Sequence, residues 1–204
     1  MSDRPHMLNS GERRENRVLS VVLAVALFLI LGISALNIWL ATCFELVLVD
    51  GPSMEETLQN GDALYIGLHD EVGRGDIVVI DVSGYPDLFP TEGGGEHFII
   101  KRIIGLEGDA VYAEGGVVYR KMSGEDEFTP LSEDYVKGET IDFGPVEVGE
   151  NEIFFLGDHR SVSKDSSRVG CLALSDVVGV VTDFSLAHKD LITGWVNFWH
   201  SGSV

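Results

Sequence analysis

The pattern of hydrophobic and polar positions divides the chain into two parts. The first is a run from Val18 to Phe44, 27 residues without a charged side chain. A helix needs only about 20 apolar residues to cross the hydrocarbon core of a bilayer. The run is about twice as long as the apolar region of a cleaved signal peptide, roughly 7 to 15 residues, and it ends in large side chains. We therefore predict an uncleaved transmembrane anchor over residues 18–44.

Beyond the anchor, apolar residues come in short runs rich in Val, Ile, Phe and Tyr, separated by Gly and Asp. This pattern is typical of β-strands, and Glu114-Gly115-Gly116 between two runs reads as a hairpin turn. The fold class predicted is mostly β, with an all-β domain over residues 45–204. The predicted strands are Glu45–Asp50, Ala63–Ile66, Asp76–Val82, Phe98–Ile104, Ala110–Ala113, Val117–Arg120, Glu152–Leu156 and Val177–Asp183.

Two stretches interrupt this pattern. Ser83–Glu96 is rich in Gly and Pro, which predicts a loop. Lys121–Glu150 is acidic and weakly periodic. We expect a small cap or insertion at about residues 110–150.

The tail from Lys189 to Val204 has three aromatic side chains near its end, Trp195, Phe198 and Trp199. Such residues either pack on the sheet or lie at a membrane interface, where Trp is favoured. We expect packing and keep the membrane contact as the alternative.

Composition and charge exclude several classes of protein. The chain has 204 residues, of which 45% are hydrophobic and two are Cys, so neither a disordered chain nor a disulfide scaffold is expected. Fourteen Lys and Arg against 33 Asp and Glu give a net charge of −19. Such a charge repels nucleic acid over most of the surface.

The charge is distributed unevenly about the anchor. Residues 1–17 hold four Arg and three acids, whereas the chain from Glu45 onward holds 10 basic residues against 30 acidic ones. The positive-inside rule then places the segment 1–17 in the cytoplasm and the domain 45–204 outside the cell membrane. This makes the lipid bilayer one expected partner.

The candidate chemistry begins with a serine and a lysine. Ser53 lies in a turn, Gly51-Pro52-Ser53-Met54, shortly after the anchor. Strand alternation puts Lys101 on the same face as Ile99 and Ile103. Burial lowers the pKa of a lysine, which is the change a lysine needs to act as a general base near neutral pH.

Four ordered segments carry a resemblance to a known family. They are Gly51-Pro52-Ser53-Met54-Glu55-Glu56-Thr57-Leu58, then Gly75-Asp76-Ile77-Val78-Val79, then Lys101-Arg102-Ile103-Ile104-Gly105-Leu106-Glu107-Gly108-Asp109, then Gly157-Asp158-His159-Arg160 through Gly170. Over most of residues 45–183 the chain resembles the bacterial type I signal peptidases, which are membrane-anchored Ser/Lys endopeptidases.

The resemblance implies a role for each of several residues. Ser53 matches the nucleophile and Lys101 the general base, Met54 packs beside them, and Ser163 matches a serine that orients the lysine amine. Asp158 and Asp165 match structural acids, which we expect to pair with Arg102 and with Arg160 or Arg168. No metal or cofactor is needed for this chemistry.

The resemblance also implies the substrate. It would be an exported preprotein, held extended beside the strands at Val49, Asp50 and Ile99. Small residues such as Ala are expected at the first and third positions before the cut.

The chain departs from the family pattern near this site. Glu56 stands where Pro is usual and follows Glu55, and two carboxylates pointing at the dyad would raise the pKa of the lysine. His159 stands where the family usually has Asn. Ser167 stands where the family usually has Arg, and the Arg of this chain, Arg168, comes one position later. Gly51 stands where some members have a serine that donates to the oxyanion, which leaves the Ser53 backbone N–H as the expected donor.

Three other interpretations stay open at this stage. One is a Ser/His hydrolase that uses His159 or His97 as its base. Another is a catalytically impaired anchored module that binds exported proteins. A metal site is the third, although the six His show no pair at the close spacing that zinc sites favour.

Overall fold

The computed structural model describes residues 10–89 and 98–201 and divides the chain after Cys43 into two compact units. The first unit contains one helix, α1 (Ser10–Cys43). Its segment Arg17–Cys43 is long and apolar enough to cross a membrane, and none of it is buried inside the structure. The predicted span is therefore helical up to Cys43, and Phe44 already belongs to the first strand.

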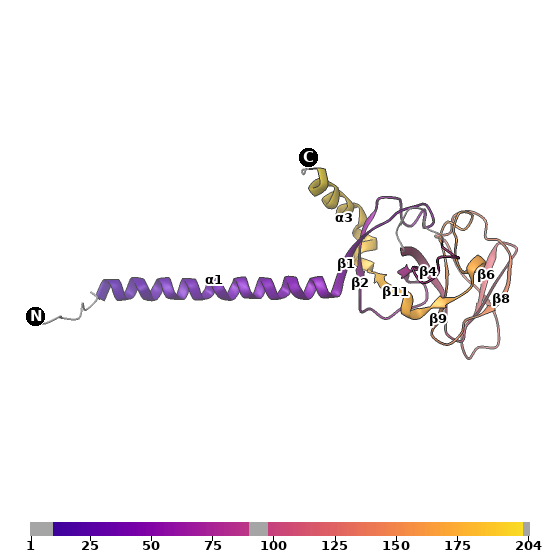
Figure 1. Cartoon of the computed structure of the whole chain (residues 1–204), viewed down its shortest axis with the longest axis horizontal. Coiled ribbons are helices and arrows are strands. Elements are labelled where there is room, and N and C mark those ends of the chain that lie inside the picture. The colour runs from indigo at the N-terminus through magenta and orange to yellow at the C-terminus, as the bar shows by residue number, and fades with distance from the viewer. Residues whose placement is uncertain (1–9, 90–97, 202–204) are drawn as a thin grey trace, which may run out of the picture. The chain divides into compact units, whose positions relative to one another are not determined.

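The second unit is built on two antiparallel sheets (Figure 1). The larger sheet has seven strands. In spatial order they are β1 (Phe44–Leu48), β2 (Ala63–Gly67), β11 (Val177–Val181), β3 (Ile77–Asp81), β4 (Phe98–Leu106), β9 (Glu152–Leu156) and β10 (Leu172–Ala173). β11 comes late in the chain yet lies between β2 and β3.

The smaller sheet has four strands, all from the middle of the chain. In spatial order they are β7 (Thr129–Pro130), β6 (Val117–Lys121), β5 (Ala110–Glu114) and β8 (Phe143–Glu147). Val111 and Val118 of this sheet pack with Ile104, Phe154 and Leu156 of the larger one. The acidic stretch 121–150 thus contributes β7 and β8; that this region is an inserted cap stays a prediction.

The eight predicted strands are all present, with ends that differ by one or two residues. The prediction of strand from Val177 to Asp183 is wrong at its end, because β11 stops at Val181 and the helix α3 (Asp183–Ser201) follows. Sequence analysis missed this helix and also the short helices α2 (Ser166–Val169) and η1 (Leu174–Asp176). Of the predicted loop Ser83–Glu96, the structure describes turns up to Phe89, and residues 90–96 lie outside the described part.

The core of the larger sheet supports the nucleophile loop. Met54 is 1% exposed and packs among side chains from several strands. Its buried neighbours are Val49, Leu58, Leu64, Ile66, Ile77, Val79 and Val181. At roughly 1.5–3 kcal/mol for each fully buried large side chain, this cluster fixes the loop firmly to the sheet.

Candidate active site

The loop after β1 presents Ser53. Gly51 has a φ of 90°, a conformation that favours glycine, and its N–H donates to Asn60 Oδ1 at 2.9 Å. Within the loop, the Glu55 N–H donates to the Pro52 carbonyl at 3.2 Å and the Leu58 N–H to the Met54 carbonyl at 2.9 Å. The chain thereby turns sharply at Ser53 while Met54 is held in the core.

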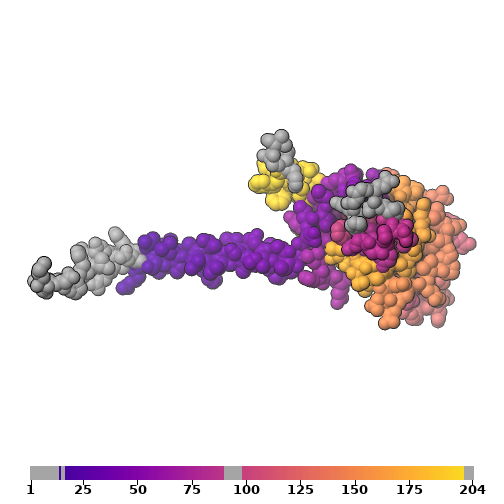
Figure 2. Space-filling view, in the orientation of Figure 1, coloured from indigo at the N-terminus to yellow at the C-terminus, as the bar shows by residue number. Residues whose placement is uncertain are grey.

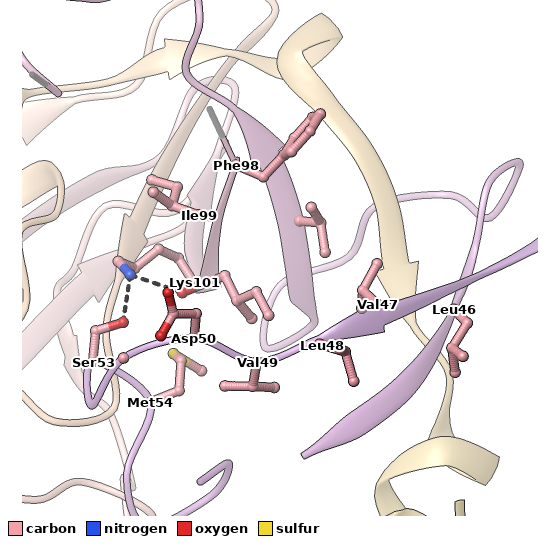
Figure 3. Close-up of a pocket in the computed structure, with 13 residues that line it drawn as sticks. Leu46, Val47, Leu48, Val49, Asp50, Ser53, Met54, Phe98, Ile99 and Lys101 are labelled. Carbon is pink, nitrogen blue, oxygen red and sulfur yellow. Dashed lines mark hydrogen bonds between the residues drawn. The ribbon is translucent and has the colours of Figure 1, made fainter. Parts of the chain in front are cut away.

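Lys101 comes to the same place from β4. Its backbone lies opposite Val78 of β3, and the residue is only 4% exposed. Its Nζ lies 2.7 Å from Ser53 Oγ and 2.8 Å from the Ile100 carbonyl oxygen (Figure 3). The two residues singled out from sequence, 48 positions apart, are therefore in direct contact.

The position of Lys101 changes its acidity. Burial in an apolar surrounding disfavours the charged amine and lowers the pKa of Lys101 from 10.5 to about 8. The carboxylates of Asp165 and Asp158 oppose this shift by favouring the charged form, with the Asp165 charge the larger of the two. Burial wins, so the amine is within about one unit of neutral pH.

The segment after β9 closes over the nucleophile loop. The His159 N–H donates to the Ser53 carbonyl oxygen at 3.1 Å. A Cβ on Gly157 would lie 2.5 Å from that same oxygen and would collide with the Ser163 side chain as well. Only glycine fits here, because any larger residue would force the two segments apart.

Ser163 is 2% exposed, and its Oγ has no hydrogen-bond partner among the described residues. Its predicted contact with the Lys101 amine is therefore not made directly in this structure. Asp165 accepts from the Gly157 N–H at 2.9 Å, and from the N–H and Oγ of Ser167 at 3.2 and 2.7 Å. Asp165 thus caps α2 and ties it to the Gly157 backbone.

The expected pairing of Arg102 with Asp158 is confirmed. Arg102 Nε and Nη2 donate to the two Asp158 carboxylate oxygens at 2.9 and 2.6 Å, a bidentate arrangement. Asp158 also accepts from Thr57 Oγ1 at 2.6 Å. The guanidinium carbon of Arg102 lies 4.0 Å from the centre of the Tyr135 ring.

The expected pairing of Asp165 with Arg160 is wrong. Arg160 instead pairs with Glu133 and donates to Thr140 Oγ1 at 2.9 Å. No ion pair joins Asp165 to Arg168 among the described residues. The physical reason is that the backbone N–H groups at the start of α2 and at Gly157 already occupy the Asp165 oxygens.

The departures from the family pattern have partners of their own. Lys137 Nζ lies 3.4 Å from a Glu55 carboxylate oxygen and 3.6 Å from one of Glu56. Neither of these carboxylates is among the charges that shift the pKa of Lys101. His159 Nδ1 lies 3.2 Å from the Pro52 carbonyl oxygen, and no hydrogen bond joins its ring to Ser53 Oγ in the described structure.

A groove of about 520 Å³ leads to the Ser53–Lys101 pair (Figure 3). The residues predicted to bind substrate, Val49, Asp50 and Ile99, all line it. β1 supplies one wall and the first half of β4 the other, although three strands separate them in the sheet. The sheet must therefore curl so that the outer edge of β1 faces β4.

Both walls of the groove have unpaired backbone edges. Within the described residues, β1 is an edge strand that pairs only with β2. β4 pairs with β3 along Phe98–Arg102, but its pairing with β9 begins only at Arg102. Among the residues that the structure describes, no strand pairs with the other side of Phe98–Lys101, which therefore offers backbone N–H and C=O groups as edge strands do.

Sequence reasoning missed several residues that build this site. Lys137, Glu133 and Tyr135 belong to the acidic stretch 121–150, which has no periodic pattern that would place them. Thr57 lies in the motif around Ser53, yet nothing in the sequence indicates its bond to Asp158. Within the described residues, no group of three or more His, Cys, Asp and Glu is close enough to hold a metal ion.

Comparisons with known proteins agree on one family. Residues 18–185 match the family model described as "Signal peptidase, peptidase S26". The chain is 35% identical to signal peptidase I of Bacillus licheniformis over 163 residues, 73% of this chain and 75% of the relative. It is 30% identical to signal peptidase I S of Bacillus subtilis over 178 residues, 78% of this chain and 84% of the relative.

A crystal structure of a signal peptidase I from Enterococcus faecalis V583 is also similar, at 28% identity and a TM-score of 0.42, over 55% of this chain and 98% of that one. The family match covers most of the chain and includes both Ser53 and Lys101. The chain thus belongs to the signal peptidases of the peptidase S26 family, which are serine endopeptidases.

Proposed function

We propose that this protein is a membrane-anchored serine endopeptidase that removes signal peptides from exported preproteins with a Ser53–Lys101 dyad. The observation that carries the proposal is the 2.7 Å contact between Lys101 Nζ and Ser53 Oγ at a buried position, where the pKa of the lysine falls to about 8. A serine hydroxyl needs a base to become a nucleophile, and a neutral amine at this distance can accept its proton.

The reaction then follows as acyl transfer. Lys101 accepts the Ser53 proton while Oγ attacks the peptide carbonyl, and the resulting ammonium gives that proton to the departing amine. An ester on Ser53 is left. Lys101, neutral again, takes a proton from water, whose oxygen attacks the ester; the ammonium then returns the proton to Ser53 Oγ as the acid is released.

The Ser53 backbone N–H is the oxyanion donor in this mechanism. It makes no hydrogen bond among the described residues, whereas the Gly51 N–H is already bound to Asn60 and Pro52 has no N–H. A donor aimed at the developing negative charge accelerates such reactions substantially, by about 10²–10³ for one donor removed in a comparable hydrolase.

Ser163 and Met54 act as positioning residues. The Ser163 hydroxyl is buried and has no hydrogen-bond partner among the described residues, and an unsatisfied buried polar group costs about 1–3 kcal/mol. This hydroxyl and the Ser53 carbonyl oxygen both lie next to Gly157. The free hydroxyl is therefore suited to bind the Lys101 amine, directly or through a water, once substrate is present. Met54 holds the nucleophile loop in the core.

The substrate binds as an extra strand in the groove. An extended peptide between β1 and Phe98–Lys101 would form backbone hydrogen bonds with both open edges, the mode called β-augmentation. Alternate side chains of such a strand point the same way. The first and third residues before the cut therefore point to the same side of the bound strand, into the groove that Val49 and Ile99 line, where small side chains such as Ala are preferred.

Membrane topology fits this substrate. The apolar helix Arg17–Cys43 spans the bilayer with residues 1–17 in the cytoplasm, as the Arg before the helix and the acids after it favour. The domain from Phe44 onward then faces the outside, where signal peptides arrive in the membrane. Among the described residues, this is the one helix long and apolar enough to span a bilayer.

The test is cleavage of a preprotein with an Ala-x-Ala site by the full chain in detergent, with the cut position read by mass. Wild type should cut after the second Ala, and Ser53→Ala and Lys101→Met should not. Ser132→Ala and Lys121→Met, which change a serine and a lysine on the smaller-sheet side of the chain, serve as matched controls and should cut normally.

The outcomes separate the competing interpretations. Cleavage by Lys101→Met combined with its loss in His159→Ala would overturn the dyad in favour of a Ser/His hydrolase. No cleavage by wild type of any of several preproteins, together with tight binding of them, would establish the impaired binding module. Loss of activity in the control variants would mean that the assay reports stability and not chemistry.

A further inference from the structure

The second part of α3 presents two apolar faces, and only one of them is covered by the described residues of the protein. The helix changes direction at His188, whose φ of −125° and ψ of 18° are not helical. After this kink, Leu191 to Trp199 contains no charged side chain. A surface helix usually has one apolar stripe that packs on the core and a polar face opposite.

The covered face fixes the helix to β2. Ile192 and Val196 are 8% and 6% exposed and pack against Ala63, and the Ala63 N–H donates to Thr193 Oγ1 at 2.8 Å. Lys189 Nζ adds contacts to the Thr57 carbonyl oxygen at 3.0 Å and to Asp62 at 3.1 Å. These contacts hold the covered face of α3 against β2.

The other face is exposed and aromatic. It consists of Leu191, Trp195, Phe198 and Trp199, which are 72%, 57%, 70% and 62% exposed. The Trp199 ring lies 6.3 Å from that of Trp195 and 6.0 Å from that of Phe198, centre to centre, so the rings form one cluster. Figure 2 shows this end of the chain, in yellow, standing out from the body of its domain.

These spacings place the four side chains together. Positions i, i+4, i+7 and i+8 fall on one side of a helix, about 100° from the side that carries Ile192 and Val196. Contiguous apolar surface of this kind on a soluble protein marks a place of contact with another apolar phase. We call this set of four residues the aromatic face.

We propose that the aromatic face of α3 inserts into the interfacial layer of the bilayer that the helix Arg17–Cys43 crosses. The argument for lipid is continuity with that span: Phe44 follows Cys43 directly, starts β1 and pairs with Gly67 of β2, and β2 carries α3. The chain therefore keeps this face tethered to a membrane. Trp is enriched at the headgroup level, and Trp, Phe and Leu form the apolar face of helices that lie in the interface.

The charge pattern also points to apolar insertion. The aromatic face has no Lys or Arg, and Lys189 beside it is engaged with Asp62. The domain from Glu45 onward is strongly acidic, so attraction to anionic lipid cannot hold it. The contact should therefore form equally well on neutral vesicles and persist in high salt.

The test uses the full chain with Trp39→Phe, which leaves Trp195 and Trp199 as the only tryptophans. The protein is reconstituted at low density into phosphatidylcholine vesicles, with and without bromine on the upper acyl chain. We expect a blue-shifted emission, a strong loss of fluorescence on the brominated lipid, and protection from aqueous acrylamide. This readout does not depend on protease activity, so it can succeed or fail independently of the proposed function.

A matched control places a single tryptophan elsewhere. In a chain with Trp39, Trp195 and Trp199 all changed to Phe, Val117→Trp puts the probe at an apolar side chain of β6 that is 38% exposed. The fluorescence of this tryptophan should be quenched by aqueous acrylamide and should not be quenched by brominated lipid. Equal quenching of both probes would overturn the proposal, as would water-like emission from α3. Protection of α3 that appears only at high protein density, with crosslinks between copies, would assign the aromatic face to self-association instead.

Discussion

The pH dependence of cleavage follows directly from the environment of Lys101. With a pKa of about 8, the amine is neutral in about a tenth of molecules at pH 7, in half at pH 8 and in about nine tenths at pH 9. With the ordinary value of 10.5, about one molecule in 3,000 would be neutral at pH 7. Burial therefore raises the fraction of molecules with a neutral Lys101 roughly 300-fold at neutral pH.

The cleavage rate should follow the fraction of molecules in which Lys101 is neutral. We expect kcat/KM for a short peptide with an Ala-x-Ala site to rise about fivefold from pH 7 to pH 8, and less than twofold from pH 8 to pH 9, because in the proposed mechanism only the neutral lysine accepts the Ser53 proton. The measurement is a pH profile of the full chain in detergent, at substrate concentrations well below KM. A short soluble peptide is used so that membrane insertion does not limit the rate.

The Asp165→Asn variant tests the direction in which the pH profile should shift. The Asp165 charge raises the pKa of Lys101, so its removal should lower that pKa and move the ascending limb of the profile toward acid. A matched change at a carboxylate outside the site, Asp126→Asn, should leave the limb in place. A limb centred above pH 10 in wild type, or a shift toward alkali in Asp165→Asn, would refute the assignment of the limb to Lys101.

Three further changes test how the site is held together. Lys101→Met should stabilise the folded domain by up to about 3 kcal/mol at pH 7, because burying the charged amine costs stability. In wild type, the free energy of unfolding should rise as the pH increases from about 8, the pKa of Lys101 in the folded protein, to 10.5, its pKa in the unfolded chain. Gly157→Ala should cost about 1–3 kcal/mol and about 10²-fold in kcat, because its Cβ would push on the Ser53 carbonyl oxygen. Arg102→Met should cost about 3–5 kcal/mol, since it leaves the Asp158 carboxylate buried without its partner. Thermal unfolding in detergent measures the first and third, and peptide cleavage measures the second.

Each of these changes has a control. Gly144→Ala adds the same methyl group where nothing lies within 4 Å, so it should change neither stability nor rate. Asp158→Asn added to Arg102→Met should recover part of the lost stability. A Lys101→Met protein whose unfolding still varies with pH as wild type does between pH 8 and 10.5 would show that another group titrates there.

The strands and the burial of Lys101 could be predicted from sequence because local patterns specify them. Alternation in Phe98–Ile104 placed Lys101 on the inner side of its strand, and the structure buries it there. α3 was missed because its apolar residues lie on two adjacent faces, which blurs the helical period, and because Thr193 and Gly194 are poor helix formers. β8 was missed because it contains Gly144 and Pro145, which are unusual inside strands.

The supporting network could not be predicted because its contacts are far apart in sequence. Lys137 and Glu55 are 82 positions apart. The sequence contains many acidic residues, and nothing in it indicates which of them pairs with a given basic residue. The expected partner of Asp165 was wrong for the same reason. A carboxylate beside the start of a helix can accept hydrogen bonds from backbone N–H groups. Nothing in the sequence indicates that Asp165 does this instead of pairing with an Arg.

The position of β11 governs when this enzyme can exist during synthesis. β11 lies between β2 and β3, so residues 177–181 supply the strand pairing that joins the half of the sheet next to the Ser53 loop to the half that carries Lys101. A chain that has emerged as far as β10 lacks the strand that brings nucleophile and base together. Pairings over such long sequence separations form late, because loop closure costs entropy before the contacts compensate for it. We therefore expect proteolytic activity to appear only after residues 177–181 have been made and have paired with β2 and β3.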